Sequence, residues 1–272
     1  MKQYKINEEI LNRVLQDLKK DDYISDRAHF SERTKQEAEQ VVYKDDYVFQ
    51  DATGAYRTDE IIEDILFYLK QNNLEFEETI PNRLEYQYIW DLIRYNFIVP
   101  WKSFTNTMEK LIYVLSYIKK PTKTIAVGIN CGYTFAFMLA PLFWMKNTGQ
   151  RAYGIEKNER IANIARRNIS HLFTDDRVSI TSQDALVALD DFQPSYFDFA
   201  FLDTRSDIQI LKKLYEKIKP GGWLLMHNAS DIHFKVTIRP FLDFVRDKRY
   251  FSESYLFPID SKGLELSIKK NP

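Results

Sequence analysis

Several short groups of residues in this chain combine glycine, carboxylate and other polar side chains in patterns suited to a nucleotide-like ligand. The first group occupies residues 127–134 and reads Val127-Gly128-Ile129-Asn130-Cys131-Gly132-Tyr133-Thr134. Glycine lets the backbone turn sharply and approach a ligand, and the start of a following helix offers free N–H groups to an anion. Taken alone, the pattern also fits an ordinary turn between a strand and a helix.

Two further groups supply acceptors for a sugar and a base. Glu156 follows the apolar stretch 152–155, where a carboxylate can accept hydrogen bonds from both hydroxyls of a ribose. Ser182, Gln183 and Asp184 follow a third candidate strand, where polar side chains can bind the amino group of an adenine. Ser182 or Asp184 would equally serve as a helix N-cap.

The last two groups carry candidates for catalysis. Asp203 ends the apolar stretch 197–202, and His227-Asn228 follows the stretch 223–226. An imidazole can take a proton near neutral pH, so His227 is the candidate base. Arg205 stays protonated, so we expect it to bind an anionic group of a substrate and not to act as a base.

The rear of the chain must position these groups, and its pattern predicts an α/β fold. Short apolar segments alternate with amphipathic ones, which predicts a mostly parallel sheet with its ligand site at the carboxyl ends of the strands. The candidate strands are 124–127, 152–155, 178–181, 197–202, 223–226, 251–257 and 264–268, and the candidate helices are 134–145, 159–172, 208–218 and 235–246. No helix separates the last two strands, which predicts a C-terminal antiparallel hairpin.

The front of the chain is predicted to be mainly helical. Seven of the 8 glycines follow residue 120, and helix interiors disfavour glycine. Helical spacing of apolar residues predicts helices near 10–18, 61–69, 84–98 and 107–118. We therefore expect a helical N-terminal domain over 1–103 and a Rossmann-like domain over 104–272. The aromatic residues of the front domain could form plain core, a lid with the acceptor pocket, or a homodimer interface.

Together, the five groups resemble class I S-adenosylmethionine-dependent methyltransferases, and most closely the small O-methyltransferases related to catechol O-methyltransferase. The glycine loop of that family reads G-x-x-C-G-Y-[ST], its adenine segment contains S-Q-D, and its fourth strand ends in F-L-D, as in this chain. The resemblance implies a Rossmann-like seven-stranded sheet and S-adenosylmethionine as cosubstrate. The cofactor-binding residues that it implies are Gly128, Asn130, Cys131, Gly132, Tyr133, Thr134, Glu156, Ser182, Gln183, Asp184 and Asp203. The candidate catalytic residues are His227, Asp203 and Arg205.

The chain departs from the family at three places. Ala126 stands where the family usually has an acidic residue, two positions before the first glycine. His227 replaces one of the carboxylates that bind magnesium in metal-dependent members, and magnesium prefers oxygen ligands. Asp203, His227 and Asn228 would suit Zn, Fe or Mn instead, but a divalent metal is not favoured and no metal ligand is assigned. The Lys that relatives use as a base is absent near Asp203.

Composition limits the partners. The net charge of −1 gives no global attraction to nucleic acid or to an anionic membrane, and the single Cys131 suits a reducing cytoplasm without disulfides. We expect a cytoplasmic enzyme with no signal peptide and no membrane span. Its acceptor would be a small molecule or a peptide, and no nucleic acid is expected as a partner.

These features predict an S-adenosylmethionine-dependent methyltransferase that modifies a hydroxyl or a carboxylate. An alternative is a nicotianamine synthase-like transferase, which would move the aminobutanoyl group of the cofactor to a small amine in metallophore biosynthesis. A non-catalytic interaction protein that keeps the fold is a second alternative. A nicotinamide-dependent oxidoreductase is disfavoured, because Asn130 and Tyr133 stand where its loop needs glycine.

Overall fold

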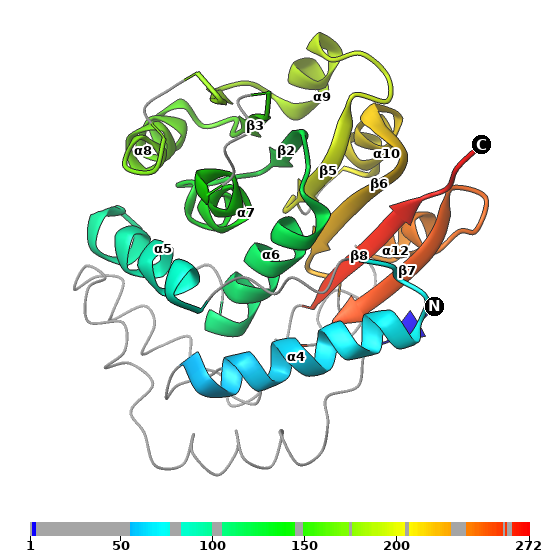
Figure 1. The fold of residues 1–272 in the computed structure, drawn as a ribbon. Helices are drawn as coiled ribbons and strands as arrows, with labels where there is room; N and C mark the ends of the chain where they lie inside the picture. The colour runs from blue at the N-terminus through cyan, green and yellow to red at the C-terminus, as the bar shows by residue number, and fades with distance from the viewer. Residues whose placement is uncertain are drawn as a thin grey trace.

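The strands of the chain form one sheet, in the order β1-β7-β8-β6-β5-β2-β3-β4 (Figure 1). The computed structural model describes residues 2–3, 55–76, 83–99, 105–144, 149–173, 176–204, 207–229, 238–257, 259 and 263–272. The strands are β1 (Lys2–Gln3), β2 (Lys123–Val127), β3 (Arg151–Ile155), β4 (Val178–Thr181), β5 (Phe197–Leu202), β6 (Ile218–His227), β7 (Phe251–Phe257) and β8 (Leu264–Lys269). All seven predicted strands are present, and within the described residues β1 adds a short eighth.

The pairing of the strands confirms the predicted Rossmann-like fold. β2 pairs in parallel with β3 on one side and with β5 on the other. β8 is antiparallel to both β6 and β7, which confirms the C-terminal antiparallel pair. The chain continues from β2 to β3 on one side of β2, and β5 later pairs on the other side. At such a reversal of strand order, a crevice opens at the carboxyl ends of β2, β3 and β5.

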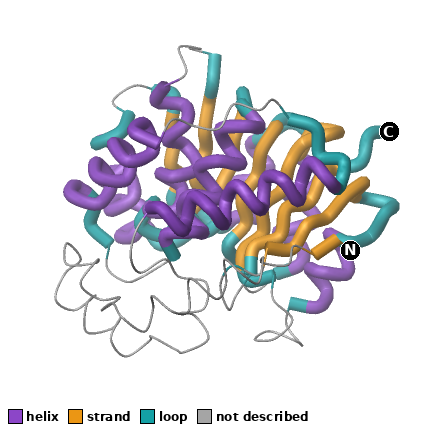
Figure 2. The backbone as a smooth tube through the Cα atoms, turned by 60° about the horizontal axis from the view of Figure 1, so that its bottom comes forward, coloured by secondary structure: helices purple, strands orange, loops and turns teal. Residues whose placement is uncertain are grey.

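Helices cover both faces of the sheet (Figure 2). One face carries α4 (Ala55–Gln71), α5 (Arg83–Asn96), α6 (Asn106–Lys119), α7 (Tyr133–Trp144) and α8 (Glu159–Ser170). The other carries α9 (Ala185–Ala188), the 3-10 turn η2 (Leu189–Asp191), α10 (Ile208–Lys217) and α12 (Arg239–Val245). Alternate residues of β2 show the division: Ile125 and Val127 pack into one core and Ala126 into the other. This two-sided burial explains why the strands read as continuous apolar runs.

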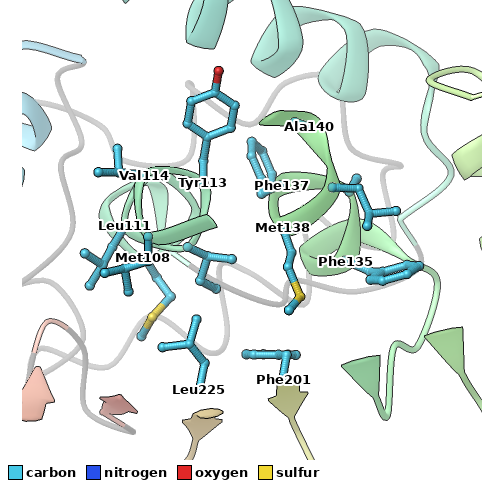
Figure 3. Close-up of a cluster of buried hydrophobic side chains, with 14 of the residues drawn as sticks. Met108, Leu111, Tyr113, Val114, Phe135, Phe137, Met138, Ala140, Phe201 and Leu225 are labelled. Atoms are coloured by element: carbon cyan, nitrogen blue, oxygen red, sulfur yellow. The ribbon is translucent and has the colours of Figure 1, made fainter. Parts of the chain in front are cut away.

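The core between α6, α7 and the sheet joins the front of the chain to its rear. Figure 3 shows Met108 and Leu111 of α6 beside Met138 of α7, above Phe201 of β5 and Leu225 of β6. α4 packs on α6, and α5 packs on α7, in the same core. The domain boundary at residue 103 stays a prediction, and the predicted helix 10–18 lies outside the described residues.

Several elements differ from the expectations: α4 begins at Ala55 and not near 61, and α9 with η2 was not predicted. β6 begins at Ile218, whereas the predicted strand began at 223, after Pro220 and two glycines. Ile218 pairs with Phe197 of β5 across an irregular register, so the strand starts before its glycines and continues through them. α12 begins at Arg239, while residues 235–237 of that predicted helix are outside the described residues. Among the described helices, none has the length and apolar character that a membrane crossing requires.

Asp198 connects the amino ends of β2, β5 and β6. Its Oδ2 accepts hydrogen bonds from Thr122 N (3.0 Å), Thr122 Oγ1 (2.5 Å) and Lys123 N (2.8 Å), and its Oδ1 accepts one from Lys219 Nζ (2.7 Å). Burial alone would raise the pKa of this carboxyl, but the hydrogen bonds outweigh it and the pKa is lowered. The charged carboxylate therefore stabilises the fold above its unfolded pKa, near 3.8.

Acid is expected to remove this stabilisation. As the pH falls through the lowered pKa of Asp198, the carboxyl takes up a proton and the free energy of unfolding decreases. Asp198→Asn should thus have a lower free energy of unfolding than the unmodified protein at pH 7. The difference between the two free energies should become smaller below a pH of about 3.8. Urea unfolding at both pH values measures it, with the exposed Asp243→Asn as control. A gap that is the same at both pH values would refute the role of the charge.

Candidate cofactor and catalytic site

A cavity of about 410 Å³ lies at the carboxyl ends of the strands. It is lined by Val127, Gly128, Ile155, Glu156, Lys157, Gln183, Asp184, Ala185, Leu186, Asp203, Thr204, Asp207 and Ile210. These residues follow β2, β3, β4 and β5, so the sheet brings together segments that are far apart in the sequence. The volume falls within the range of small-molecule sites in proteins.

The glycine loop turns tightly at the end of β2. Gly128 and Ile129 both donate their N–H groups to the Ile155 carbonyl (2.9 and 3.2 Å), which ties the loop to β3. Gly128 and Gly132 have φ angles of 81° and 79°, and Asn130 between them has 51°. A side chain on Gly128 would collide with the Asp203 carbonyl, so glycine is required by the neighbouring strand end as well as by the turn.

Glu156 lines the cavity and also fixes the loop. Its Oε2 accepts a hydrogen bond from Asn130 N (3.0 Å), and its Oε1 accepts one from Asn158 N (3.0 Å). The carboxylate is therefore held in one orientation at the cavity wall. Since an ionised carboxylate has about four acceptor positions, both oxygens retain capacity for the hydroxyls of a ribose.

Gln183 and Asp184 are exposed at the cavity rim, where the adenine segment was predicted. Asp184 is also the N-cap of α9, because its Oδ1 accepts a hydrogen bond from Leu186 N (2.9 Å). The two interpretations of this segment are thus compatible. Ser182 is half-buried and is not part of the lining.

Asp203 joins the cavity to a buried polar pair behind it. Its Oδ1 accepts a hydrogen bond from Asn228 Nδ2 (2.8 Å) and lies 3.1 Å from His227 Nδ1. His227 and Asn228 are 4 % exposed, while Asp203 is half-buried and faces the cavity. Nε2 of His227 is buried and His227 is not among the lining residues, so Asp203 connects the imidazole to the cavity.

The family resemblance predicts that these three residues stand at the metal positions of metal-dependent members. Asp203 Oδ1 interacts with both His227 Nδ1 and Asn228 Nδ2, so both side chains turn a nitrogen toward the carboxylate. A metal would require the Asn228 oxygen and a histidine lone pair to point at the same place as the carboxylate, and Asn228 instead turns its NH₂ group toward it. Within the described chain, no group of three or more His, Cys, Asp and Glu residues could hold a metal ion. The arrangement does not fit a metal.

The remaining predicted residues lie behind the cavity wall. Cys131, Tyr133 and Thr134 are buried at the start of α7, and Gly132 packs against Ala165 of α8. Burial raises the pKa of the Cys131 thiol to about 11, so it is protonated at neutral pH. Arg205 is outside the described residues.

Sequence reasoning missed four residues that the structure places in the cavity lining or in contact with the glycine loop. Lys157, Thr204 and Asp207 line the cavity, next to predicted residues. Asn168 of α8 is fully buried and donates to the Cys131 carbonyl (2.8 Å). Its signal in the sequence was an Asn on the apolar face of a predicted helix, next to Ile169.

Comparison with protein families gives a match over 105 of the 272 residues. Residues 125–229, from β2 to the end of β6, match the model of a methyltransferase domain. This part of the chain is a methyltransferase domain. The match includes the glycine loop, Glu156, Asp203 and His227, so it confirms the resemblance to S-adenosylmethionine-dependent methyltransferases. No curated protein has a significantly similar sequence.

Solved structures share the fold of the methyltransferase domain at low sequence identity. An O-methyltransferase from Bacillus cereus in complex with SAH has 19 % identity and a TM-score of 0.55, covering 77 % of this chain and 100 % of its own. A putative O-methyltransferase from Klebsiella pneumoniae has 15 % identity and a TM-score of 0.56, with coverage of 76 % and 96 %. The O-methyltransferase TomG from Streptomyces achromogenes, in complex with SAM, has 14 % identity and a TM-score of 0.54, covering 76 % of this chain and 95 % of its own. These likenesses concern the fold.

Proposed function

We propose that the chain binds S-adenosylmethionine in the cavity at the strand ends and methylates an oxygen atom of a small molecule or a peptide. The observation that carries the proposal is the convergence of Glu156, Gln183-Asp184 and Asp203 on one cavity beside the glycine loop. Each side chain follows a different strand and suits a different part of the cofactor. The O-methyltransferases that share the fold support the choice of oxygen as the acceptor atom.

The charges around the cavity favour a hydroxyl over a carboxylate as acceptor. Among the described lining residues, Glu156, Asp184, Asp203 and Asp207 are acidic and Lys157 alone is basic. A hydroxyl can donate to a carboxylate of this lining, whereas a carboxylate acceptor would meet like charge.

In the proposed reaction the protein must bind the cofactor, bring the loop backbone close to it and remove the proton of the hydroxyl group. S-adenosylmethionine supplies a methyl group activated by its sulfonium, so that the S–C bond breaks as the O–C bond forms and sulfur keeps the electron pair. Glu156 holds the ribose, and the loop backbone approaches the cofactor closely. His227 takes the hydroxyl proton by way of Asp203, the member of the pair that lines the cavity. The products are S-adenosylhomocysteine, a methyl ether and a proton.

Calorimetry and product analysis test the function directly. We expect S-adenosylmethionine and S-adenosylhomocysteine to bind with one site per chain. Incubation with methyl-labelled S-adenosylmethionine and a library of small hydroxyl compounds should transfer label and release S-adenosylhomocysteine. Release of methylthioadenosine would favour aminobutanoyl transfer, which the buried Ala126 in place of an acid leaves open. Absence of binding to either ligand would indicate an interaction protein.

Replacing Glu156 is expected to weaken cofactor binding. Glu156→Ala removes the ribose acceptor and frees Asn130 N–H, so the affinity for S-adenosylhomocysteine should fall by roughly 1–3 kcal/mol. Glu156→Gln keeps the shape but sets an NH₂ group against one backbone N–H, so an intermediate loss is expected. The exposed Glu159→Ala, three residues away, is the control. Equal affinities in Glu156→Ala and Glu159→Ala, measured by calorimetry, would contradict the assignment.

We further propose a cytoplasmic enzyme without a nucleic-acid or membrane partner, on the basis of the charge balance and of Cys131. A homodimer through the front helices is part of the same proposal. Light scattering of the purified full chain would decide between a monomer and a dimer.

A further inference from the structure

Asn168 connects two parts of the chain that lie on either side of it. It belongs to α8 and is fully buried. Its Oδ1 accepts a hydrogen bond from Ile98 N (2.8 Å), and its Nδ2 donates to Ile98 O (2.9 Å). The same Nδ2 donates to Cys131 O (2.8 Å) in the glycine loop. One side-chain amide thus binds the segment after α5 and the loop beside the cofactor cavity.

The backbone of Ile98 is held by this amide, while its neighbours are held by packing. Val99 is buried in the core and Phe97 packs against that core, whereas Ile98 is 40 % exposed and gains less from burial. The amide of Asn168 pairs with both the N–H and the carbonyl of Ile98, as a neighbouring strand would. Because each hydrogen of Nδ2 goes to a different carbonyl, the positions of Ile98 and Cys131 are linked through one planar group.

α8 is also close to the glycine loop at a second point. Gly132 lies against Ala165, one turn before Asn168, at a distance where a Cβ on Gly132 would be 3.2 Å from the Ala165 Cβ. Ala165 and Asn168 lie on the same face of the helix, three residues apart. The loop therefore cannot shift relative to α8 without disturbing the hydrogen bond to Cys131.

We propose that Asn168 is a positioning residue that couples occupancy of the glycine loop to the placement of the front helices. Binding of the cofactor holds the loop backbone in place, and the Asn168 amide passes this restraint to Ile98 and hence to the end of α5. The cofactor would then bind first, and the front of the chain would be set for the acceptor afterwards. This inference rests on the proposed cofactor site. Coupling between two such places is reciprocal, so loss of the link must also weaken binding at the loop.

Hydrogen exchange of the backbone amides tests the coupling. In the unmodified protein, S-adenosylhomocysteine should slow the exchange of residues 97–99 as well as that of the loop. In Asn168→Ala the ligand should bind about tenfold more weakly. At saturation it should still protect the loop but no longer change exchange at 97–99. Asn163→Ala on the same helix, which removes an exposed contact with Arg166, should behave like the unmodified protein.

A purely structural Asn168 would give a different result. In that case Asn168→Ala would lower the melting temperature, while the ligand would protect 97–99 in both proteins or in neither, and the proposal would be overturned. Asn168→Asp provides a second variant, since it keeps the acceptor for Ile98 N and loses both donated bonds. It should therefore lose the link to Cys131. Failure of S-adenosylhomocysteine to bind the unmodified protein would refute the proposed function itself, which separates the two conclusions.

Discussion

Replacing His227 with alanine is expected to lower turnover by about 10²–10⁴-fold while leaving the affinity for S-adenosylhomocysteine nearly unchanged. His227 lies behind Asp203 and not in the cavity lining, so its loss should not remove a cofactor contact. A hydroxyl acceptor must lose its proton during transfer, and the part of the chain that the structure describes offers no Lys beside Asp203. Loss of His227 should therefore slow the step in which the hydroxyl loses its proton. Steady-state kinetics with calorimetry on the same samples measures both effects.

Three controls make the result specific to proton transfer. His227→Gln keeps a hydrogen bond to Asp203 but cannot act as a base, so it should be as slow as His227→Ala. The decline of turnover at acid pH that a histidine base produces should disappear in both variants. Treatment with EDTA should leave the unmodified protein active, because the arrangement at Asp203 does not fit a metal. A fully active His227→Ala, or strong inhibition by EDTA, would refute the role given to His227.

The α/β architecture could be predicted because local signals agree with the tertiary structure. Strands buried on both faces read as apolar runs, and α8 and α10 show one apolar stripe, whereas α7 is apolar on all sides and buried. The start of β6 could not be predicted in this way. Pro220 and Gly221-Gly222 are turn residues, and only the pairing of Ile218 with Phe197 makes this stretch part of a strand.

The candidate site was predicted where it depends on position along the chain and missed where it depends on contacts across it. Glu156 and Asp203 were found because they follow apolar strands whose ends meet at one edge of a sheet. Asn168 binds Ile98 over a separation of 70 residues, and no local pattern reports such a hydrogen bond. The second function of Glu156, holding Asn130 N–H, was hidden for the same reason.

Gly128→Ala is expected to be the most damaging small substitution in the glycine loop. Its φ angle of 81° is costly for any other residue, by about 1–2 kcal/mol. The new Cβ would also collide with the Asp203 carbonyl and touch the Thr204 side chain, and such overpacking costs roughly 1–3 kcal/mol more. Either the loop or the end of β5 must move. A displacement of about 1 Å there should weaken the binding of S-adenosylhomocysteine and lower turnover about 100-fold.

Gly221→Ala is the matched control for this prediction. Gly221 has a similar φ angle of 69°, but the nearest neighbour of an added Cβ would be Asn271 Oδ1 at 3.4 Å, in ordinary contact. It belongs to β6 and does not line the cavity. The two variants therefore share the backbone strain and differ in the collision with Asp203. Urea unfolding should show the larger loss of stability for Gly128→Ala, and calorimetry should show weakened binding only there. Equal stability and equal affinity in the two variants would mean that the loop tolerates a side chain, and that its glycine does not set the close approach between β2 and β5.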